Sequence, residues 1–265
     1  MIKKVLFIFL LFSNSVFSQI EKSDSNLSKV LNNKIGIQIG NNFGYLKDLN
    51  FSVLNYNESG LLYSLDYINQ KPNGKGIFNA DIDFSLGKLK SKASEYFTSD
   101  ITLANLEVSY IRLLAKKENQ LIFFLGGQYN SYLQILDWND FESFSFLATH
   151  GIGVKGLLQC NLNSKHTFKT SLFIPVFQNL VRPPYNAIDE TIIENQDNTL
   201  KLIFSGKLSS FNTYFSFDWK LNYVFEVAKR FDLTATYLVR YQKVSEINTV
   251  KHLQNQITFG ANFKF

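Results

Sequence analysis

Cysteine, charge and long apolar runs are all scarce in this chain of 265 residues. The single cysteine, Cys160, cannot form an internal disulfide, so the fold must be stable without one. No stretch reaches the roughly 18 consecutive apolar residues that mark a transmembrane helix. Charged residues make up 18% of the chain and hydrophobic residues 45%, which excludes a disordered, highly charged protein.

Aromatic residues, in contrast, are abundant. The chain has 26 Phe and 13 Tyr, a composition that favours β-strands over helices. The net charge is +5, and two of those charges belong to Lys3 and Lys4. The remaining lysines and arginines are scattered along the sequence without a cluster that could follow a phosphate backbone, so no nucleic-acid partner is expected.

The N-terminus is typical of an export signal. Lys3 and Lys4 precede the apolar run Val5–Phe12, which is followed by small and polar residues. Eight apolar residues are too few to cross a bilayer, which takes about 20. We therefore predict a signal peptide over residues 1–18 and a periplasmic N-terminal tail over residues 19–33.

The rest of the chain alternates between apolar and polar residues with a period of two. In Phe215–Val227 the odd positions are apolar or aromatic, and all but one of the even positions are polar. The same alternation runs through 231–242 and 256–265. The runs span 10 to 15 residues, whereas soluble strands usually have about 5–6 and transmembrane strands about 9–11. This length favours a transmembrane β-barrel over a soluble β-sandwich.

Short and long polar breaks follow one another along the chain, as in barrels with short periplasmic turns and long outer loops. We predict an all-β, antiparallel transmembrane β-barrel over residues 34–265 with about ten strands. Segment Leu200–Phe204 could belong to two further strands, which leaves twelve as the alternative. The predicted strands are 34–44, 50–70, 75–88, 101–115, 121–134, 147–160, 165–177, 213–228, 231–243 and 255–265.

The final strand resembles the C-terminal signature of bacterial outer-membrane β-barrel proteins. It alternates over Ile257–Phe265 and closes on a terminal phenylalanine. The resemblance implies residence in the outer membrane of a Gram-negative envelope and contact with outer-membrane lipids. It also implies recognition by the barrel-assembly machinery through an assembly signal that includes Phe263 and Phe265. The composition is similar to that of barrels from Bacteroidota.

The polar face of the strands must line the lumen. A lumen of about ten strands is narrow, so its charges are expected to pair. The alternatives are a narrow passive, porin-like channel and a functional acid site at Asp81 and Asp83. The predicted lumen charge network consists of Asp66, Asp81, Asp83, Glu107, Lys155, Lys169, Asp218, Lys220, Arg240 and Lys264.

The sequence offers little support for an enzyme. His150, near the outer end of its strand, could activate water with Asp137, Asp140 or Glu142 of the adjoining loop. However, no serine lies two residues from His150, so the His-x-Ser arrangement of lipid-A-deacylating barrels is missing. We assign no catalytic residue, and the spacing of His, Cys and acids indicates neither a metal site nor a cofactor.

The connection over 178–200 is the longest in the chain, and connections of this length are usually functional or disordered. Its acids could collect a Ca²⁺ ion, although a solvated acidic loop is the simpler interpretation. The candidate outer binding loop is marked by Arg182, Tyr185, Asp189, Glu190 and Glu194.

The sequence therefore predicts a non-enzymatic structural or interaction subunit of an envelope assembly, with an envelope protein as its partner. Two alternatives stay open. One is a narrow passive channel, and the other is a hydrolase that acts from the outer rim around His150.

Overall fold

The computed structural model describes residues 32–72, 74–93, 96–117, 121–138, 143–183, 204–246 and 248–265. The predicted signal peptide and nearly all of the predicted periplasmic tail lie outside these residues. Within them, no helix has the length and apolar character needed to span a membrane.

The described chain consists of eleven β-strands. They are β1 (Asn33–Asp48), β2 (Tyr56–Gln70), β3 (Gly76–Ser91), β4 (Thr98–Lys117), β5 (Leu121–Trp138), β6 (Ser143–Asn161), β7 (His166–Val181), β8 (Lys207–Ser209), β9 (Tyr214–Ala228), β10 (Phe231–Val244) and β11 (Val250–Lys264).

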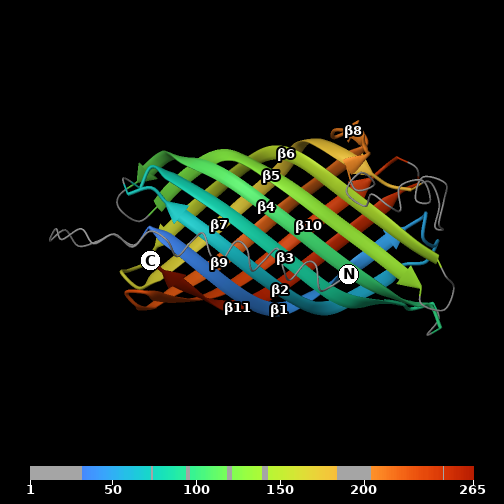
Figure 1. Ribbon diagram of the computed structural model, residues 1–265, viewed down its shortest axis with the longest axis horizontal. Coiled ribbons are helices and arrows are strands. Elements are labelled where there is room, and N and C mark those ends of the chain that lie inside the picture. Colours follow the sequence, from blue (N-terminus) through green and yellow to red (C-terminus); the bar gives the residue numbers. More distant parts are fainter. Residues whose placement is uncertain are drawn as a thin grey trace, which may run out of the picture. The chain divides into compact units, whose positions relative to one another are not determined.

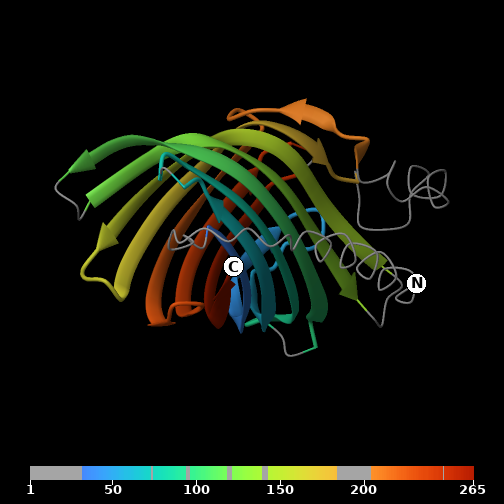
Figure 2. The same cartoon turned by 60° about the vertical axis from the view of Figure 1, so that its left-hand side comes forward.

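Ten of these strands close into an antiparallel barrel (Figure 1). Neighbours in sequence are neighbours in the sheet, β1 pairs with β11, and β6 pairs with β7. The three-residue β8 pairs only with the outer part of β7 and lies outside the wall, as Figure 2 also shows. The prediction of ten strands is confirmed, and the alternative of twelve is not realised.

The two ends of the barrel differ in their connections. β1 begins and β11 ends at the end that carries the short turns, at the left in Figure 1. The opposite end carries the longer loops, including the connection between β7 and β9. By the rule for bacterial barrels, the first is the periplasmic end and the second the outer end.

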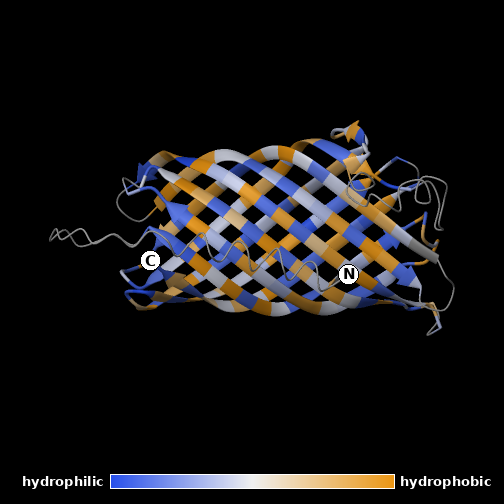
Figure 3. Cartoon of the chain, viewed as in Figure 1, coloured by the Kyte–Doolittle hydropathy of each residue, from blue (hydrophilic) through white to orange (hydrophobic). Residues whose placement is uncertain are grey.

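Apolar and polar residues alternate along the strands, as Figure 3 shows. In β4 the odd positions from Ser99 to Ile111 are all buried in the lumen, whereas Leu106 and Tyr110 between them are exposed on the outside. Exposed large hydrophobic side chains occur on every one of the ten barrel strands. A wall that is apolar on the outside suits a hydrocarbon surrounding.

Most strands reach three to five residues further toward the outer end than the alternation predicted. β1 ends at Asp48 rather than at residue 44, and β11 begins at Val250 rather than at 255. The predicted strand 50–70 shortens most, because β2 begins only at Tyr56. Phe51 instead leaves the wall and is buried in the outer end of the lumen.

Glycines allow the wall to bend tightly where β1 meets β11. A Cβ on Gly40 would lie 1.8 Å from the carbonyl oxygen of Ile257, so only glycine fits this close approach. The one proline inside a barrel strand, Pro175, lies beside a register shift between β6 and β7. A β-bulge is a position where a sheet tolerates proline.

Candidate functional site

The centre of the lumen is built around a buried arginine. Arg240 on β10 donates from Nε and Nη2 to the two carboxylate oxygens of Asp218, over 2.9 and 2.7 Å. Nη2 also donates to Glu107 Oε1 on the opposite wall, over 3.0 Å. Bidentate contacts of this kind are the strong form of an arginine–carboxylate pair. The arginine therefore ties β9 and β10 to β4 across the barrel.

A lysine extends this network along the lumen. Lys220 Nζ lies 3.3 Å from Asp81 Oδ2 and 3.5 Å from Glu107 Oε2. Asp83 accepts a hydrogen bond from Asn105, which also donates to Glu107. Both acids of the predicted Asp81–Asp83 pair thus face lumen donors.

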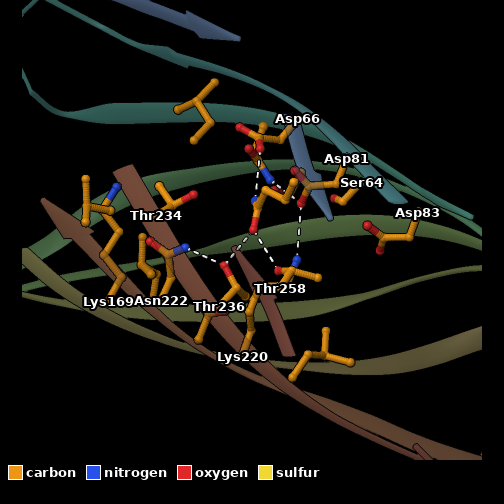
Figure 4. Close-up of a pocket in the computed structure, with 18 of the residues that line it drawn as sticks. Ser64, Asp66, Asp81, Asp83, Lys169, Lys220, Asn222, Thr234, Thr236 and Thr258 are labelled. Carbon is orange, nitrogen blue, oxygen red and sulfur yellow. Dashed lines mark hydrogen bonds and ion pairs between the residues drawn. The ribbon is translucent and has the colours of Figure 1, made fainter. Parts of the chain in front are cut away.

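A polar cavity of about 130 Å³ lies beside Lys220 (Figure 4). Asp66, Asp81 and Asp83 border it on one side, and Lys169 and Lys220 on the other. The side chains between them form a chain of hydrogen bonds: Asn222 donates to Thr236, Thr236 and Thr258 donate to Gln38, and Gln38 donates to Asp66.

Lys155 and Lys169 differ from the other lumen cations. Lys155 Nζ donates to Ser109 Oγ over 3.3 Å. Lys169 borders the cavity and forms no ion pair with a described carboxylate. Hydration of the cavity suits such a lysine, because a buried cation without any polar partner is strongly penalised.

A second group of ion pairs closes the periplasmic end. Lys264 Nζ lies 2.7 Å from Glu226 and 2.8 Å from Asp232, and Lys34 Nζ lies 2.8 Å from the same aspartate. These contacts join β1, β9, β10 and β11 close to the two ends of the barrel chain. All ten residues of the predicted lumen network thus lie on the inner face. They belong to the central ion pairs, to the periplasmic ion pairs or to the border of the cavity.

The sequence reasoning missed a buried histidine site. His252 precedes the predicted last strand, 255–265, and so was expected in a connection, but it lies on β11 with no exposed surface, and its Nε2 is 2.6 Å from Glu58 Oε2. Its Nδ1 is 3.4 Å from the hydroxyl of Tyr132, and Asn42 donates to the other oxygen of Glu58. The prediction was wrong because the polar parity of the last strand continues outward past residue 255.

The outer end of the lumen is filled with apolar side chains. We call this group of side chains, which come from the outer ends of the strands, the outer plug. Its fully buried members include Leu46, Leu89, Leu136, Val244 and Val250, and Phe51 packs against Tyr56 and Trp138.

Arg182 covers this end of the barrel. Its Nη2 lies 2.6 Å from Asp48 Oδ1, and both side chains are almost completely buried. Burial lowers the pKa of the Arg182 guanidinium, while the Asp48 carboxylate opposes that shift. The other residues predicted for the outer binding loop, Tyr185, Asp189, Glu190 and Glu194, lie outside the described residues.

His150 faces outward rather than into the lumen. It is 8% exposed, its Nδ1 lies 2.8 Å from Ser131 Oγ on β5, and its ring stacks on Phe204 at a centroid distance of 4.2 Å. Its predicted partners Asp140 and Glu142 lie outside the described residues. The serine is a cross-strand neighbour, which a search along the sequence could not find.

The predicted assembly signal lies at the periplasmic end of the outer wall. Phe263 and Phe265 are about 40% exposed and stack on each other with centroids 6.2 Å apart. The backbone N–H of Phe265 donates to the carbonyl of Asn33, so the last residue is held against the first strand. In the part of the chain that the structure describes, no three His, Cys, Asp or Glu residues form a cluster suited to a metal ion.

Comparisons with known proteins agree on the fold. No protein-family model and no curated protein matches the sequence. The outer membrane protease OmpT from Escherichia coli is similar in structure over 92% of this chain and 100% of its own, with 8% identity and a TM-score of 0.53. The translocator domain of the autotransporter NalP from Neisseria meningitidis is similar over 99% of this chain and 95% of its own chain, with 8% identity and a TM-score of 0.43.

The likeness to OmpT shows the fold of a bacterial outer-membrane barrel. It agrees with the closed sheet and with the apolar outer wall. The chain thus has the fold of bacterial outer-membrane β-barrel proteins.

Proposed function

We propose that this outer-membrane barrel is a closed, non-enzymatic structural or interaction subunit of an envelope assembly. The observation that carries the proposal is the outer plug. Buried leucines, valines and tyrosines in the outer lumen leave the wall and the loops as the surfaces on which the protein acts. We infer that a partner binds at the outer end, where Arg182 holds the start of the long loop against Asp48.

The plug also argues against the passive channel. Ions need a continuous polar path, but the outer lumen is lined by Leu46, Leu89 and Leu136, which have no exposed surface. The polar cavity next to the ion pairs is small, about 130 Å³.

Two measurements test the proposal. In the first, the tagged protein is extracted from native outer membranes in mild detergent and its partners are identified by mass spectrometry. A stoichiometric envelope protein is expected, and replacement of residues 184–203 by a flexible linker should release it. Recovery of the barrel alone at native expression level would contradict the proposed role.

The second measurement is conductance in a planar bilayer. We expect no single-channel steps from the natural protein. The variant Tyr56→Ala/Tyr132→Ala/Tyr214→Ala, which removes three buried rings from the plug, should conduct if it folds. The matched control Phe43→Ala/Tyr63→Ala/Phe84→Ala removes three outward rings and should stay silent. Regular steps from the natural protein would instead establish the channel.

One observation favours a second function, a hydrolase at the outer rim. A serine hydroxyl within hydrogen-bond distance of an imidazole is the arrangement that activates a nucleophile, and Ser131 and His150 meet this criterion at 2.8 Å. Phe204 covers the imidazole, so access to the pair requires this ring to move. A fluorophosphonate probe tests the idea: labelling that is lost in Ser131→Ala and strengthened in Phe204→Gly supports a hydrolase, and absence of labelling in the natural protein rejects it.

A further inference from the structure

Three lysines far apart in sequence lie side by side on the outer wall. Lys47 of β1 is paired with Lys251 of β11, and Lys251 is paired in turn with Lys243 of β10. Directly opposite residues on neighbouring strands have Cα atoms about 4.5–5.5 Å apart. The three side chains therefore form a row across adjacent strands, which we call the lysine row.

The lysine row points away from the lumen. On each of the three strands a residue adjacent to the lysine is on the inner face and buried: Asp48 after Lys47, Val244 after Lys243, and Val250 before Lys251. Lys243 and Lys251 are exposed, and Lys47 is half-buried. None of the three side chains forms an ion pair or hydrogen bond within the described residues.

This arrangement is unfavourable for an isolated barrel. Like charges directly opposite each other in a sheet are destabilising, and here one lysine is opposed on both sides. Two other lysines at the outer end have partners, since Lys88 pairs with Asp100 and Lys207 with Glu246. Among the described residues the lysine row has no such carboxylate, and an anion from outside the chain would offset its repulsion.

The position of the lysine row along the barrel axis indicates where that anion would lie. On β1 the outward residues run from Ile35 through Ile37, Ile39 and Phe43 to Tyr45, and Lys47 comes next. The ten steps from Ile35 to Tyr45 span about 33 Å along the strand, which at a tilt of roughly 40° is about 25 Å of height. That height equals the apolar band of outer-membrane barrels, about 25 Å. The lysines therefore begin where the hydrocarbon ends.

The neighbouring strands have the same boundary. The outward residues that pair just below the row are Tyr45, Leu253 and Tyr241. Tyrosines at this level form the interfacial girdle of a barrel. A lipid whose acyl chains lie against the apolar wall would thus place its headgroup at Lys47, Lys243 and Lys251.

We infer that the lysine row binds the phosphate of an outer-leaflet glycolipid, the lipid A part of lipopolysaccharide. A phosphate carries up to two negative charges and several acceptor oxygens, so it can contact adjacent ammonium groups at once. A globular acidic partner would not need the row to stand at the hydrocarbon boundary. The inference concerns the lipid-facing wall and does not rest on the proposed function.

The test measures lipid A retained by the purified barrel in detergent, by native mass spectrometry. We expect the natural protein to bind bisphosphorylated lipid A and to bind the dephosphorylated form at least about tenfold more weakly. Lys47→Gln/Lys243→Gln/Lys251→Gln should lose about tenfold or more in affinity for the phosphorylated form, because each cation near an anionic headgroup contributes about fivefold. Inorganic phosphate alone should compete only at much higher concentration.

Two controls separate the row from a general charge effect. Lys116→Gln/Lys117→Gln/Lys229→Gln removes three exposed cations from the periplasmic turns and should leave binding unchanged. The triple arginine variant at 47, 243 and 251 keeps the charge and should retain binding. Equal binding by the triple glutamine variant, or equal binding of both lipid forms by the natural protein, would overturn the inference.

Stability gives a readout that needs no ligand. In detergent without lipid A, the triple glutamine variant should unfold at a higher temperature than the natural protein, because the opposed charges are gone. Addition of phosphorylated lipid A should raise the unfolding temperature of the natural protein only. A natural protein that gains no stability from lipid A would contradict a bound phosphate.

Discussion

Replacement of Arg240 by alanine is the sharpest test of the lumen network. The guanidinium is 2% exposed and contacts Asp218 by two hydrogen bonds and Glu107 by one. Its loss leaves Asp218 without a cationic partner, while Glu107 keeps Lys220 at 3.5 Å. The variant therefore leaves one buried carboxylate without a cationic partner.

The expected cost follows from the burial of the pair. Removal of one partner of a buried ion pair typically costs about 3–5 kcal/mol, because the remaining charge stays desolvated. With a urea dependence of about 2 kcal/mol per M, the unfolding midpoint should fall by roughly 2 M. Arg240→Ala/Asp218→Ala removes the stranded charge as well and should recover part of the loss, although it deletes more atoms.

The assay is urea unfolding of the refolded barrel in detergent, followed by the shift in gel mobility between folded and unfolded forms. Lys88→Ala is the control, because its pair with Asp100 is exposed and should contribute less than about 1 kcal/mol. If Arg240→Ala costs no more than Lys88→Ala, the lumen network does not stabilise the barrel. If the double variant is less stable than Arg240→Ala alone by the full cost of Asp218→Ala, the two residues are not coupled.

Three further predictions address the wall. Gly40→Val should prevent closure, because a Cβ there would lie 1.8 Å from a backbone oxygen of the last strand, whereas outward-facing Gly127→Ala should fold normally; equal refolding yields would contradict the account of the seam. A nitroxide on Cys160 should be more accessible to oxygen dissolved in lipid than to a water-soluble nickel complex. A nitroxide on Gln159→Cys in a Cys160→Ser background should show the reverse. The same ranking at both sites would refute the assignment of faces. Phe265→Ser should lower the yield of barrel inserted into the outer membrane of cells but leave the refolding yield in detergent unchanged. An unchanged yield in cells would contradict the predicted assembly signal.

Alternation along the strands predicted which residues face the lumen, because it requires only that side chains change sides at every residue. It failed at the outer end of β5, where both faces are apolar. Leu133 and Ile135 face outward there, while Leu136 belongs to the outer plug. Where apolar side chains of the plug alternate with apolar side chains of the outer wall, the period of two disappears, so the predicted strand ended too early.

The contacts between distant strands could not be predicted. Arg240 and Glu107 are 133 residues apart, and their contact depends on the diameter of the closed barrel. The same holds for the lysine row, whose members look scattered in the sequence. Glu58 and His252 had a usable signal, since each continues the polar parity of its strand toward the outer end.

The seam between β1 and β11 has a consequence for the time course of folding. It joins the first strand to the last, and Lys34 contacts Asp232 across 198 residues of chain. Contacts of such high sequence separation form late, because a long loop must close before they contribute. The first strand to be synthesised therefore has an unpaired edge until the last one arrives, and arrival of the C-terminal strand sets the moment at which both the wall and its ion pairs become complete.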